Sequence, residues 1–217
     1  MEKLAKNDFV EIEYTGKIKE NNSIFDTNIP EEAKKLELDI KTRPYTICVG
    51  QNMILKAIDE FLLGKETSKQ YTLNLPPEKA FGLRDRKLIK IMPISVFAKQ
   101  NINPHQGMVF SFDNLLGKIS SVSGGRVIVD FNNPIAGKDV VYEIRIKRKV
   151  IDEKEKVKSL LSAFLGRELE FDIENQKLKI KAEKGSTKFL NLFKEKFKEI
   201  LNLELFVEEI EEKKRRA

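Results

Sequence analysis

The chain has 217 residues, 41% of them hydrophobic and 34% charged, which is enough apolar material for one good core and one or two smaller ones. One cysteine excludes an intramolecular disulfide, and no apolar run approaches the roughly 20 residues that cross a bilayer or resembles a secretion signal, so we expect a cytoplasmic protein without a membrane partner. The formal net charge of +6 is compatible with a nucleic-acid binder, but basic and acidic residues are mixed along the chain without a basic stripe, so no nucleic-acid partner is expected.

Alternating apolar residues predict several strands in the first 75 residues. Residues 9–18 alternate with period two, and residues 23–26 follow a polar turn and read as the returning strand. Residues 28–41 are polar and irregular, which indicates a surface excursion. A short apolar strand is predicted at 45–49, and residues 70–75 alternate again before two prolines stop the strand.

One helix is predicted between the strands at 45–49 and 70–75. Its apolar residues recur at helical spacing until Gly64, and they are Ile54, Leu55, Ile58 and Leu62. One face of this helix must therefore be buried. Far downstream, residues 140–147 alternate again and form the last strand of the predicted sheet.

The segment between residues 83 and 132 differs from its surroundings. It contains three short strand signals, at 107–112, 117–122 and 126–131, and a Ser-Gly-Gly turn joins the last two into a hairpin. A compact β module is the predicted result.

After Val150 the pattern is helix, strand, strand, helix, strand. Asp152 can cap the first helix and Gly166 can end it, and Ser186 can cap the second. A segment of this length folds alone only marginally, so docking on a partner or on another copy is expected. The segment has no catalytic constellation. Self-association and client binding both fit it, and a homodimer through this segment is the prediction.

Four stretches of the chain, taken in order, resemble the FKBP family of peptidyl-prolyl cis/trans isomerases. Residues 8–16 followed by Phe25 and Asp26 resemble the opening strands of that family. Residues 50–64 are similar to its single helix. Pro-Pro-Glu-Lys-Ala-Phe-Gly, ending at Gly82, resembles a loop that usually reads Ala-Tyr-Gly, and residues 140–144 resemble the strand whose aromatic side chain faces the pocket.

A further stretch narrows the resemblance within the family. Residues 129–138 read Val-Asp-Phe-Asn-Asn-Pro-Ile-Ala-Gly-Lys, similar to the Asn-His-Pro-Leu-Ala-Gly-Lys stretch of SlyD-type and archaeal members that have an insert-in-flap domain. The additional C-terminal segment resembles the long archaeal subclass. The SlyD histidine-rich tail that binds nickel is absent, and His105 is the single histidine of the chain, so no metal site is expected.

The resemblance implies an α+β fold. An antiparallel half-barrel sheet would wrap on one helix, with an inserted small β-rich domain and a C-terminal α+β domain of αββαβ order. The implied isomerase domain is discontinuous, at 1–85 plus 130–150. The insert-in-flap chaperone domain would span 86–129, and the C-terminal domain 151–217.

The resemblance also implies an activity and a pocket. Rotation about an X-Pro bond has a barrier of about 20 kcal/mol, and the twisted state has lost the resonance that makes the amide polar. A dry apolar hollow favours that less polar state, so no cofactor is needed. The residues carried over by position are Tyr14, Phe25, Asp26, Ile54, Leu55, Ile58, Phe81 and Tyr142. Without the resemblance, the apolar members would be read as ordinary core.

Within the implied pocket, Tyr14 and Asp26 are the polar members and would orient the rotating amide. Phe81 stands where the family has a tyrosine whose hydroxyl donates a hydrogen bond to the bound carbonyl. The loss of this hydroxyl leaves open an alternative, a non-enzymatic holding chaperone on the same scaffold. A ribosome-associated or nucleic-acid binder is a more distant alternative that rests on net charge alone.

For the inserted domain, its apolar residues lead to the hypothesis that it binds unfolded or partly folded polypeptides. An apolar, methionine-containing set would provide the contacts, because flexible methionines and exposed sheet edges suit extended chains of varied sequence. The set is Ile89, Ile91, Met92, Ile94, Val96, Phe97, Met108 and Phe110. The alternative is that these residues form the small core of the module itself.

Overall fold

The structure is a computed structural model that describes residues 2–36, 45–112, 115–166, 169–183 and 185–210. The chain forms two compact units, one of residues 1–15, 27–71 and 143–217 and the other of residues 16–26 and 72–142. Their elements are mixed α+β with mainly antiparallel sheets, as the resemblance implies. No described helix has the length and apolar character that crossing a membrane requires.

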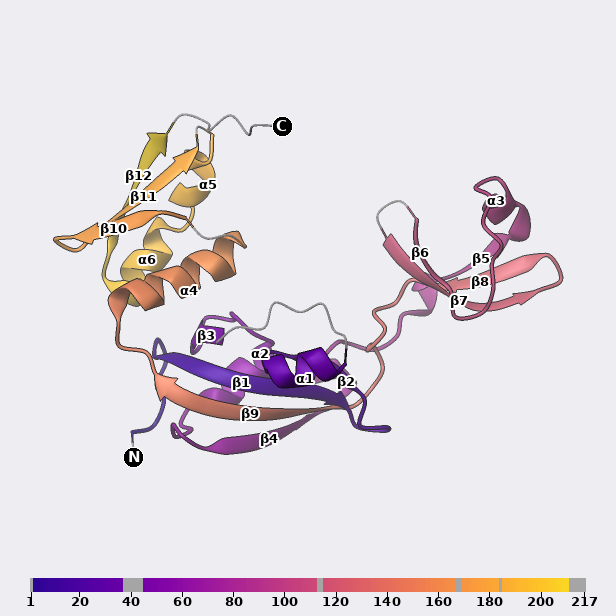
Figure 1. Cartoon of the computed structure of the whole chain (residues 1–217), viewed down its shortest axis with the longest axis horizontal. Coiled ribbons are helices and arrows are strands. Elements are labelled where there is room, and N and C mark those ends of the chain that lie inside the picture. The colour runs from indigo at the N-terminus through magenta and orange to yellow at the C-terminus, as the bar shows by residue number, and fades with distance from the viewer. Residues whose placement is uncertain (1, 37–44, 113–114, 167–168, 184, 211–217) are drawn as a thin grey trace. The chain divides into compact units, whose positions relative to one another are not determined.

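A five-stranded sheet forms from the strands that the sequence predicted, in the order β2-β1-β9-β4, with β3 paired antiparallel to β1 (Figure 1). Alternate residues of the last predicted strand are buried, at Val140, Tyr142, Ile144 and Ile146, which confirms its one-sided pattern. The strands are β1 (Phe9–Ile18), β2 (Ile24–Thr27), β3 (Tyr45–Cys48), β4 (Gln70–Leu75) and β9 (Val140–Lys149).

The predicted helix is shorter than its apolar pattern. Helix α2 spans Lys56–Leu62, and Leu55 is its N-cap with φ −47° and ψ 126°, so Ile54 and Leu55 precede the helix. Gly64 follows the helix with φ +73°, a backbone conformation that favours glycine. The segment at 28–41, predicted as an irregular surface excursion, begins with a short helix, α1 (Pro30–Lys35), and its residues 37–41 lie outside the described part of the chain. Proline at its start, acidic residues in its first turn and lysines in its last turn all favour a helix there.

The inserted module is a four-stranded antiparallel sheet in the order β5-β8-β7-β6. Gly124 and Gly125 join β7 to β8 with φ of +54° and +74°, as a tight hairpin turn requires. Strand β5 and the short helix α3 were not predicted, because their sequence, Ile-Lys-Ile-Met-Pro-Ile-Ser-Val-Phe-Ala, fits neither period clearly. The elements are β5 (Ile89–Pro93), α3 (Ile94–Ala98), β6 (Val109–Phe112), β7 (Leu115–Ser123) and β8 (Arg126–Asp130).

Hydrogen bonds tie the two segments that lead into and out of the module. The side-chain amide of Asn132 accepts from the Asp85 backbone N–H at 2.8 Å and donates to the Asp85 carbonyl at 3.0 Å. Arg84 and Asp130 form an ion pair beside it. We refer to these four residues as the neck of the insert.

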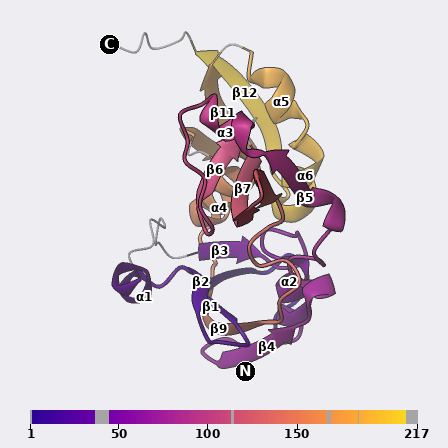
Figure 2. The same cartoon turned by 90° about the vertical axis from the view of Figure 1, so that its right-hand side faces the viewer.

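The C-terminal segment follows the predicted order with one correction. The second predicted helix is two helices, α5 (Thr187–Asn191) and α6 (Lys194–Leu201), which run alongside β12 (Figure 2). Phe193 lies at the break and its ring stacks on Phe164, with centroids 5.0 Å apart. The other elements are α4 (Glu153–Leu165), β10 (Phe171–Glu174), β11 (Lys177–Glu183) and β12 (Glu204–Ile210).

Caps and pairing in this segment follow from its sequence. The Asp152 carboxylate accepts from the Glu155 backbone N–H at 2.8 Å, and Gly166 ends α4 with φ +65°, as predicted. Strand β12 pairs parallel to β11, and α5 with α6 forms the crossover that a parallel pair needs. The core of the segment also includes Phe9, Cys48 and Val150, so α4 packs against β3 of the same chain. That contact adds buried area that a segment of this size lacks alone.

Candidate functional site

Three aromatic rings from the predicted pocket meet in one unit. They come from different elements: Phe25 is on β2, Tyr142 on β9, and Phe81 follows the short turn of 3₁₀ helix at Pro77–Lys79. The Phe25 ring stands edge-on to Phe81, with centroids 5.4 Å apart and planes at 87°, and edge-on to Tyr142 at 5.8 Å and 89°. Edge-to-face packing of this kind fixes ring orientation. We call these residues the aromatic trio.

Gly16 on β1 gives the trio its space. A Cβ atom at this position would lie 2.9 Å from Cζ of Phe25 and 2.9 Å from Cε1 of Tyr142, closer than real carbon contacts allow. Gly16 was not among the predicted site residues. A glycine inside an alternating strand is a signal for close approach of another group, and that signal was present in the sequence.

The other predicted pocket residues have different degrees of burial. Ile54 and Leu55 are half-buried just before α2, and Ile58 inside α2 has no exposed surface. Tyr14 on β1 is half-buried, and its ring lies edge-on to Tyr45 with centroids 6.2 Å apart. Asp26, at the third position of β2, is also half-buried.

Tyr45 contacts both Tyr14 and the loop before α2. Its hydroxyl donates to the Met53 carbonyl at 2.6 Å, one residue before Ile54. Cys48, at the end of β3, is fully buried, and burial is the largest cause that raises the pKa of its thiol to about 12, followed by the charges of Asp59 and Asp8. A thiol in that state is inert, so Cys48 is core rather than a nucleophile.

The eight residues predicted to bind clients divide into two groups in the structure. Phe97 is buried in the core of the insert with Ile119, Val127 and Val129. Four others, Met92, Val96, Met108 and Phe110, are partly buried against that core. Only Ile89, Ile91 and Ile94 are exposed, with Ile91 65% accessible. Five of the eight predicted residues therefore lie in the core of the module or against it, since four short strands and one helix offer few other apolar residues.

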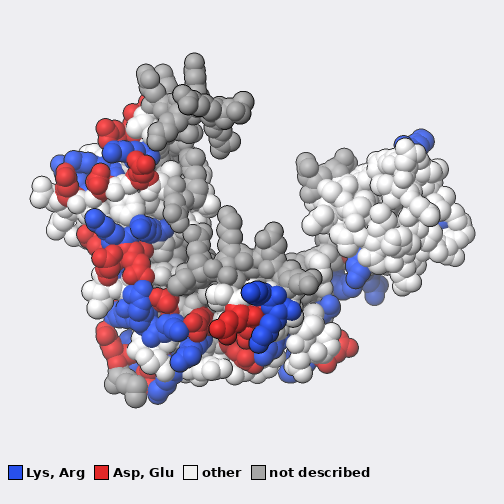
Figure 3. Space-filling model, viewed as in Figure 1, with Lys and Arg blue, Asp and Glu red and all other residues white. Residues whose placement is uncertain are grey.

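The exposed isoleucines at 89 and 91 lie on a common face of the insert sheet. Residues that lie opposite each other in an antiparallel ladder project to the same side of the sheet. Ile91 pairs with Ile128, and Ile89 pairs with Asp130. Asp130 also pairs with Lys118, and Lys118 pairs with Val109. We call this side of the insert sheet, which includes Ile89, Ile91, Val109 and Leu116, the outer face. Val109 and Leu116 are 58% and 70% exposed and were not predicted. Figure 3 shows one side of the insert with few charged side chains.

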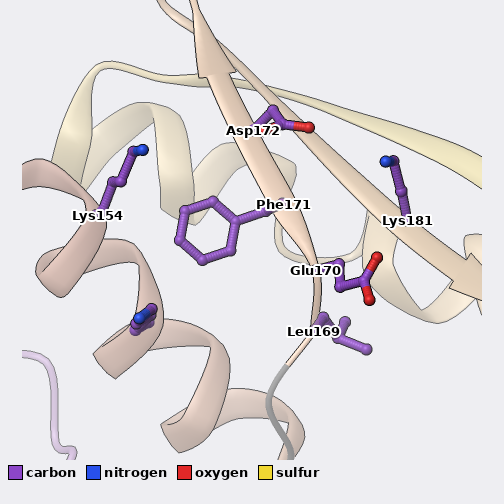
Figure 4. A pocket seen from close by; sticks show the side chains of 7 residues that line it. Lys154, Leu169, Glu170, Phe171, Asp172 and Lys181 are labelled. Carbon is purple, nitrogen blue, oxygen red and sulfur yellow. The ribbon is translucent and has the colours of Figure 1, made fainter.

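A separate groove of about 380 Å³ lies on the C-terminal segment (Figure 4). Phe171 of β10 points toward α4, whose Lys154 and Lys158 line the other wall. Glu170, Asp172 and Lys181 also line it, so its charge is mixed and selects no ligand class. Among the residues that the structure describes, no group of three or more His, Cys, Asp or Glu side chains could hold a metal ion.

Two family models match the chain. The model described as FKBP-type peptidyl-prolyl cis-trans isomerase matches residues 1–111, and the model described as FKBP26, IF domain, matches residues 90–135. The second match lies over the inserted sheet, from β5 to the segment after β8.

Named relatives agree with these models. The short-type peptidyl-prolyl cis-trans isomerase of Methanocaldococcus jannaschii is 31% identical over 147 residues, which cover 66% of this chain and 92% of that protein. A probable FKBP-type 16 kDa isomerase of Pseudomonas fluorescens is 31% identical over 108 residues, covering 48% of this chain and 71% of its own. The SlyD isomerase of Vibrio cholerae is 28% identical over 102 residues, covering 45% and 50%.

A solved structure of the three FKBP domains of wheat FKBP73 aligns with a TM-score of 0.38 at 15% identity, over 70% of this chain and 42% of that one. A likeness of that size adds nothing about the arrangement of the elements. The match of the family model to half of the chain, and the relative covered over nearly its whole length, do establish the relationship. The chain belongs to the family of FKBP-type peptidyl-prolyl cis-trans isomerases and includes an IF domain.

Proposed function

We propose that this isomerase accelerates X-Pro isomerisation in folding proteins and that its inserted domain binds the unfolded chain. The observation that supports the isomerase part most is the aromatic trio around Gly16. Rings at fixed edge-on angles form a stiff apolar wall, and a proline ring is the side chain that such a wall fits. Phe25 and Tyr142 hold the proline ring, with Phe81 beside the following carbonyl.

The proposed mechanism needs no covalent step. An apolar wall removes water from the prolyl amide, and the planar amide loses more solvation than the twisted one because resonance makes it more polar. The barrier therefore falls by differential stabilisation of the twisted state. Ile54, Leu55 and Ile58 add apolar contacts in this proposal, and Tyr14 and Asp26 orient the amide.

A short-peptide isomerisation assay tests the catalytic part. We expect turnover by the intact chain and a large loss with Ile54→Asp, because a carboxylate placed against the proline ring keeps water in the hollow. Asp26→Ala should reduce turnover less, since it removes an orienting group and no apolar wall. An intact chain that holds unfolded protein soluble but turns over no prolyl peptide would favour the non-enzymatic chaperone, the alternative that Phe81 leaves open.

For the insert, we propose that the outer face and the two edge strands bind clients. Support comes from the exposure of Ile91, Val109 and Leu116 on one side of a small sheet, a larger apolar area than scattered surface residues give. Strands β5 and β6 are the edges of the described sheet, and an extended segment can add to an edge through backbone hydrogen bonds.

The double variant Ile91→Glu with Leu116→Glu tests the insert in the full chain. It should slow proline-limited refolding of a protein substrate, because two carboxylates repel the apolar side chains of the client, and it should leave short-peptide turnover unchanged. Lys99→Glu, an exposed change just after α3, is the matched control and should alter neither assay. Equal losses in both assays would contradict the division of labour between the insert and the aromatic trio.

We also propose that the chain self-associates through its C-terminal segment. Phe189 and Leu192 are 50% and 73% exposed in and just after the short helix α5, and Phe206 on β12 is 41% exposed. Sedimentation of the full chain against Leu192→Glu tests this. A monomer in both samples rejects the proposal, while a dimer that Leu192→Glu dissociates supports it.

A further inference from the structure

The described residues contain four buried polar or charged side chains: Thr15, Thr27, Asn28 and Asp59. Burying such groups destabilises a fold unless each finds hydrogen-bond partners. Their partners are concentrated at two places, the backbone around Tyr14 and the loop that precedes Ile54 and Leu55. Both places belong to the same compact unit, and both hold residues proposed for the isomerase site.

Asn28 holds the backbone of Tyr14. Its side-chain oxygen accepts from the Tyr14 N–H at 2.7 Å, and its side-chain nitrogen donates to the Ile12 carbonyl at 2.8 Å. Its own N–H donates to the Tyr14 carbonyl at 3.2 Å. Strand β2 ends one residue earlier, at Thr27. Beyond that point the Asn28 side chain supplies the hydrogen bonds to β1 that the backbone of β2 no longer makes.

Two threonines and a glutamate extend this contact. The Thr27 hydroxyl donates its single proton to the Tyr14 carbonyl at 3.0 Å, and the Glu32 carboxylate on α1 accepts from the Thr15 hydroxyl. A connected set of buried hydrogen bonds is stiffer than the same bonds made separately. Tyr14 is therefore fixed through both of its backbone polar groups.

Asp59 holds the loop between β3 and α2. Its two carboxylate oxygens accept from the Gly50 N–H at 2.8 Å and the Asn52 N–H at 2.7 Å. Both of those residues have positive φ, +81° and +54°, so the loop turns sharply twice before Ile54. Asp59 is 2% exposed, and the structure gives it no salt bridge within the described ranges. Backbone N–H groups rather than a cation stabilise its carboxylate.

We propose that Asn28 and Asp59 are positioning residues of the isomerase, Asn28 for Tyr14 and Asp59 for Ile54 and Leu55. Neither is expected to contact the substrate. The inference rests on the proposed function of those three residues. It adds that the buried polar groups of this unit orient the site rather than serve general stability.

The two residues should have different kinetic effects. Asn28→Ala frees Tyr14, which orients the amide in the twisted state, so kcat should fall with little change in KM. Asp59→Ala frees the loop that presents two apolar walls to the proline ring, so KM should rise. A displacement near 1 Å corresponds to a loss of up to about 100-fold, and we expect a loss of 10- to 100-fold in kcat/KM for each. Asp59→Asn keeps one acceptor and should be intermediate.

Spectroscopy separates positioning from stability. The chain has 4 tyrosines and no tryptophan, so a spectrum of ¹³C-labelled tyrosine rings is simple to assign. Asn28→Ala should shift the Tyr14 signals and leave Tyr71 in place. Asp59→Ala should shift the Ile54 methyl signal. Val127→Ala, in the core of the insert, is the control that lowers stability without touching either place.

The outcomes are distinct. Variants that keep wild-type kinetics, with Tyr14 and Ile54 signals unmoved, overturn the positioning inference. So does an equal loss of turnover in Val127→Ala. A wild-type chain without prolyl turnover rejects the proposed function instead, and the ring and methyl spectra then still decide whether Asn28 and Asp59 fix those side chains.

Discussion

Adding one methyl group at Gly16 should damage the aromatic trio. In Gly16→Ala the new carbon would start 2.9 Å from both the Phe25 and the Tyr142 ring, while ordinary contacts begin at 3.4 Å, so each ring must retreat by about 0.5 Å to reach an ordinary contact. The rings cannot retreat independently, because Phe25 is edge-on to both Phe81 and Tyr142. Overpacking of this kind costs about 1–3 kcal/mol of folding stability, and a shift of such a wall costs roughly 10- to 100-fold in kcat/KM.

Gly117 offers a matched control in the insert. A Cβ there would lie 2.7 Å from Val129 and 2.8 Å from Phe131, so Gly117→Ala creates similar crowding far along the chain from the trio. The assay compares prolyl-peptide turnover with urea unfolding for both variants. Gly16→Ala should lose turnover although the variant is still folded in the absence of urea. Gly117→Ala should lose folding stability and keep peptide turnover. Wild-type turnover in Gly16→Ala would refute the assignment of the trio to catalysis.

Three further predictions follow from single residues. Burial raises the pKa of Cys48 to about 12 from an ordinary value of 9.0, so the thiol of the unfolded chain loses its proton first, and the free energy of unfolding should fall between these pH values by up to about 1.4 kcal/mol per pH unit. Urea unfolding at pH 8 and pH 10 should show a larger loss of stability for wild type than for Cys48→Ala. Equal losses would contradict the burial. Phe81→Tyr supplies the hydroxyl usual in the family, worth about 1 kcal/mol, so peptide affinity should rise about fivefold; unchanged affinity would show that no carbonyl binds there. Asn132→Ala removes two hydrogen bonds of the neck to Asp85, so trypsin should cut after Arg84 faster than in wild type, while an unchanged cleavage rate would mean that the neck is held by other contacts.

Much of the fold follows from local sequence. Strands with an alternating sequence pattern, such as β1 and β9, were predicted with bounds close to those observed. Hairpin and cap residues such as Gly125, Asp152 and Gly166 act through their immediate neighbours, so they too were predictable. The start of α2 was not, because Ile54 and Leu55 fit the helical spacing but the loop bonds to Asp59 hold them outside the helix.

The candidate site depends on contacts between segments far apart in the chain. Family motifs predicted Phe25, Phe81 and Tyr142 as pocket members, but the edge-on contacts and the role of Gly16 depend on three-dimensional packing. The client-binding set shows the opposite limit. Composition indicated an apolar module, but only the strand register separates Ile91, which is 65% exposed, from its neighbour Met92, which packs against the core of the module. A one-residue difference in register exchanges the two faces, and no local pattern in β5 fixes it.

The place of β9 in the sheet has a consequence for synthesis on the ribosome. It lies between β1 and β4, yet the chain makes it only after the whole inserted sheet. A nascent chain therefore completes its inserted sheet while β1 and β4 still lack their shared neighbour. Local pairing folds faster than pairing across a long loop. The part proposed to hold clients is thus ready before the part proposed to rotate their prolines, and one polypeptide acquires its two abilities in a fixed order.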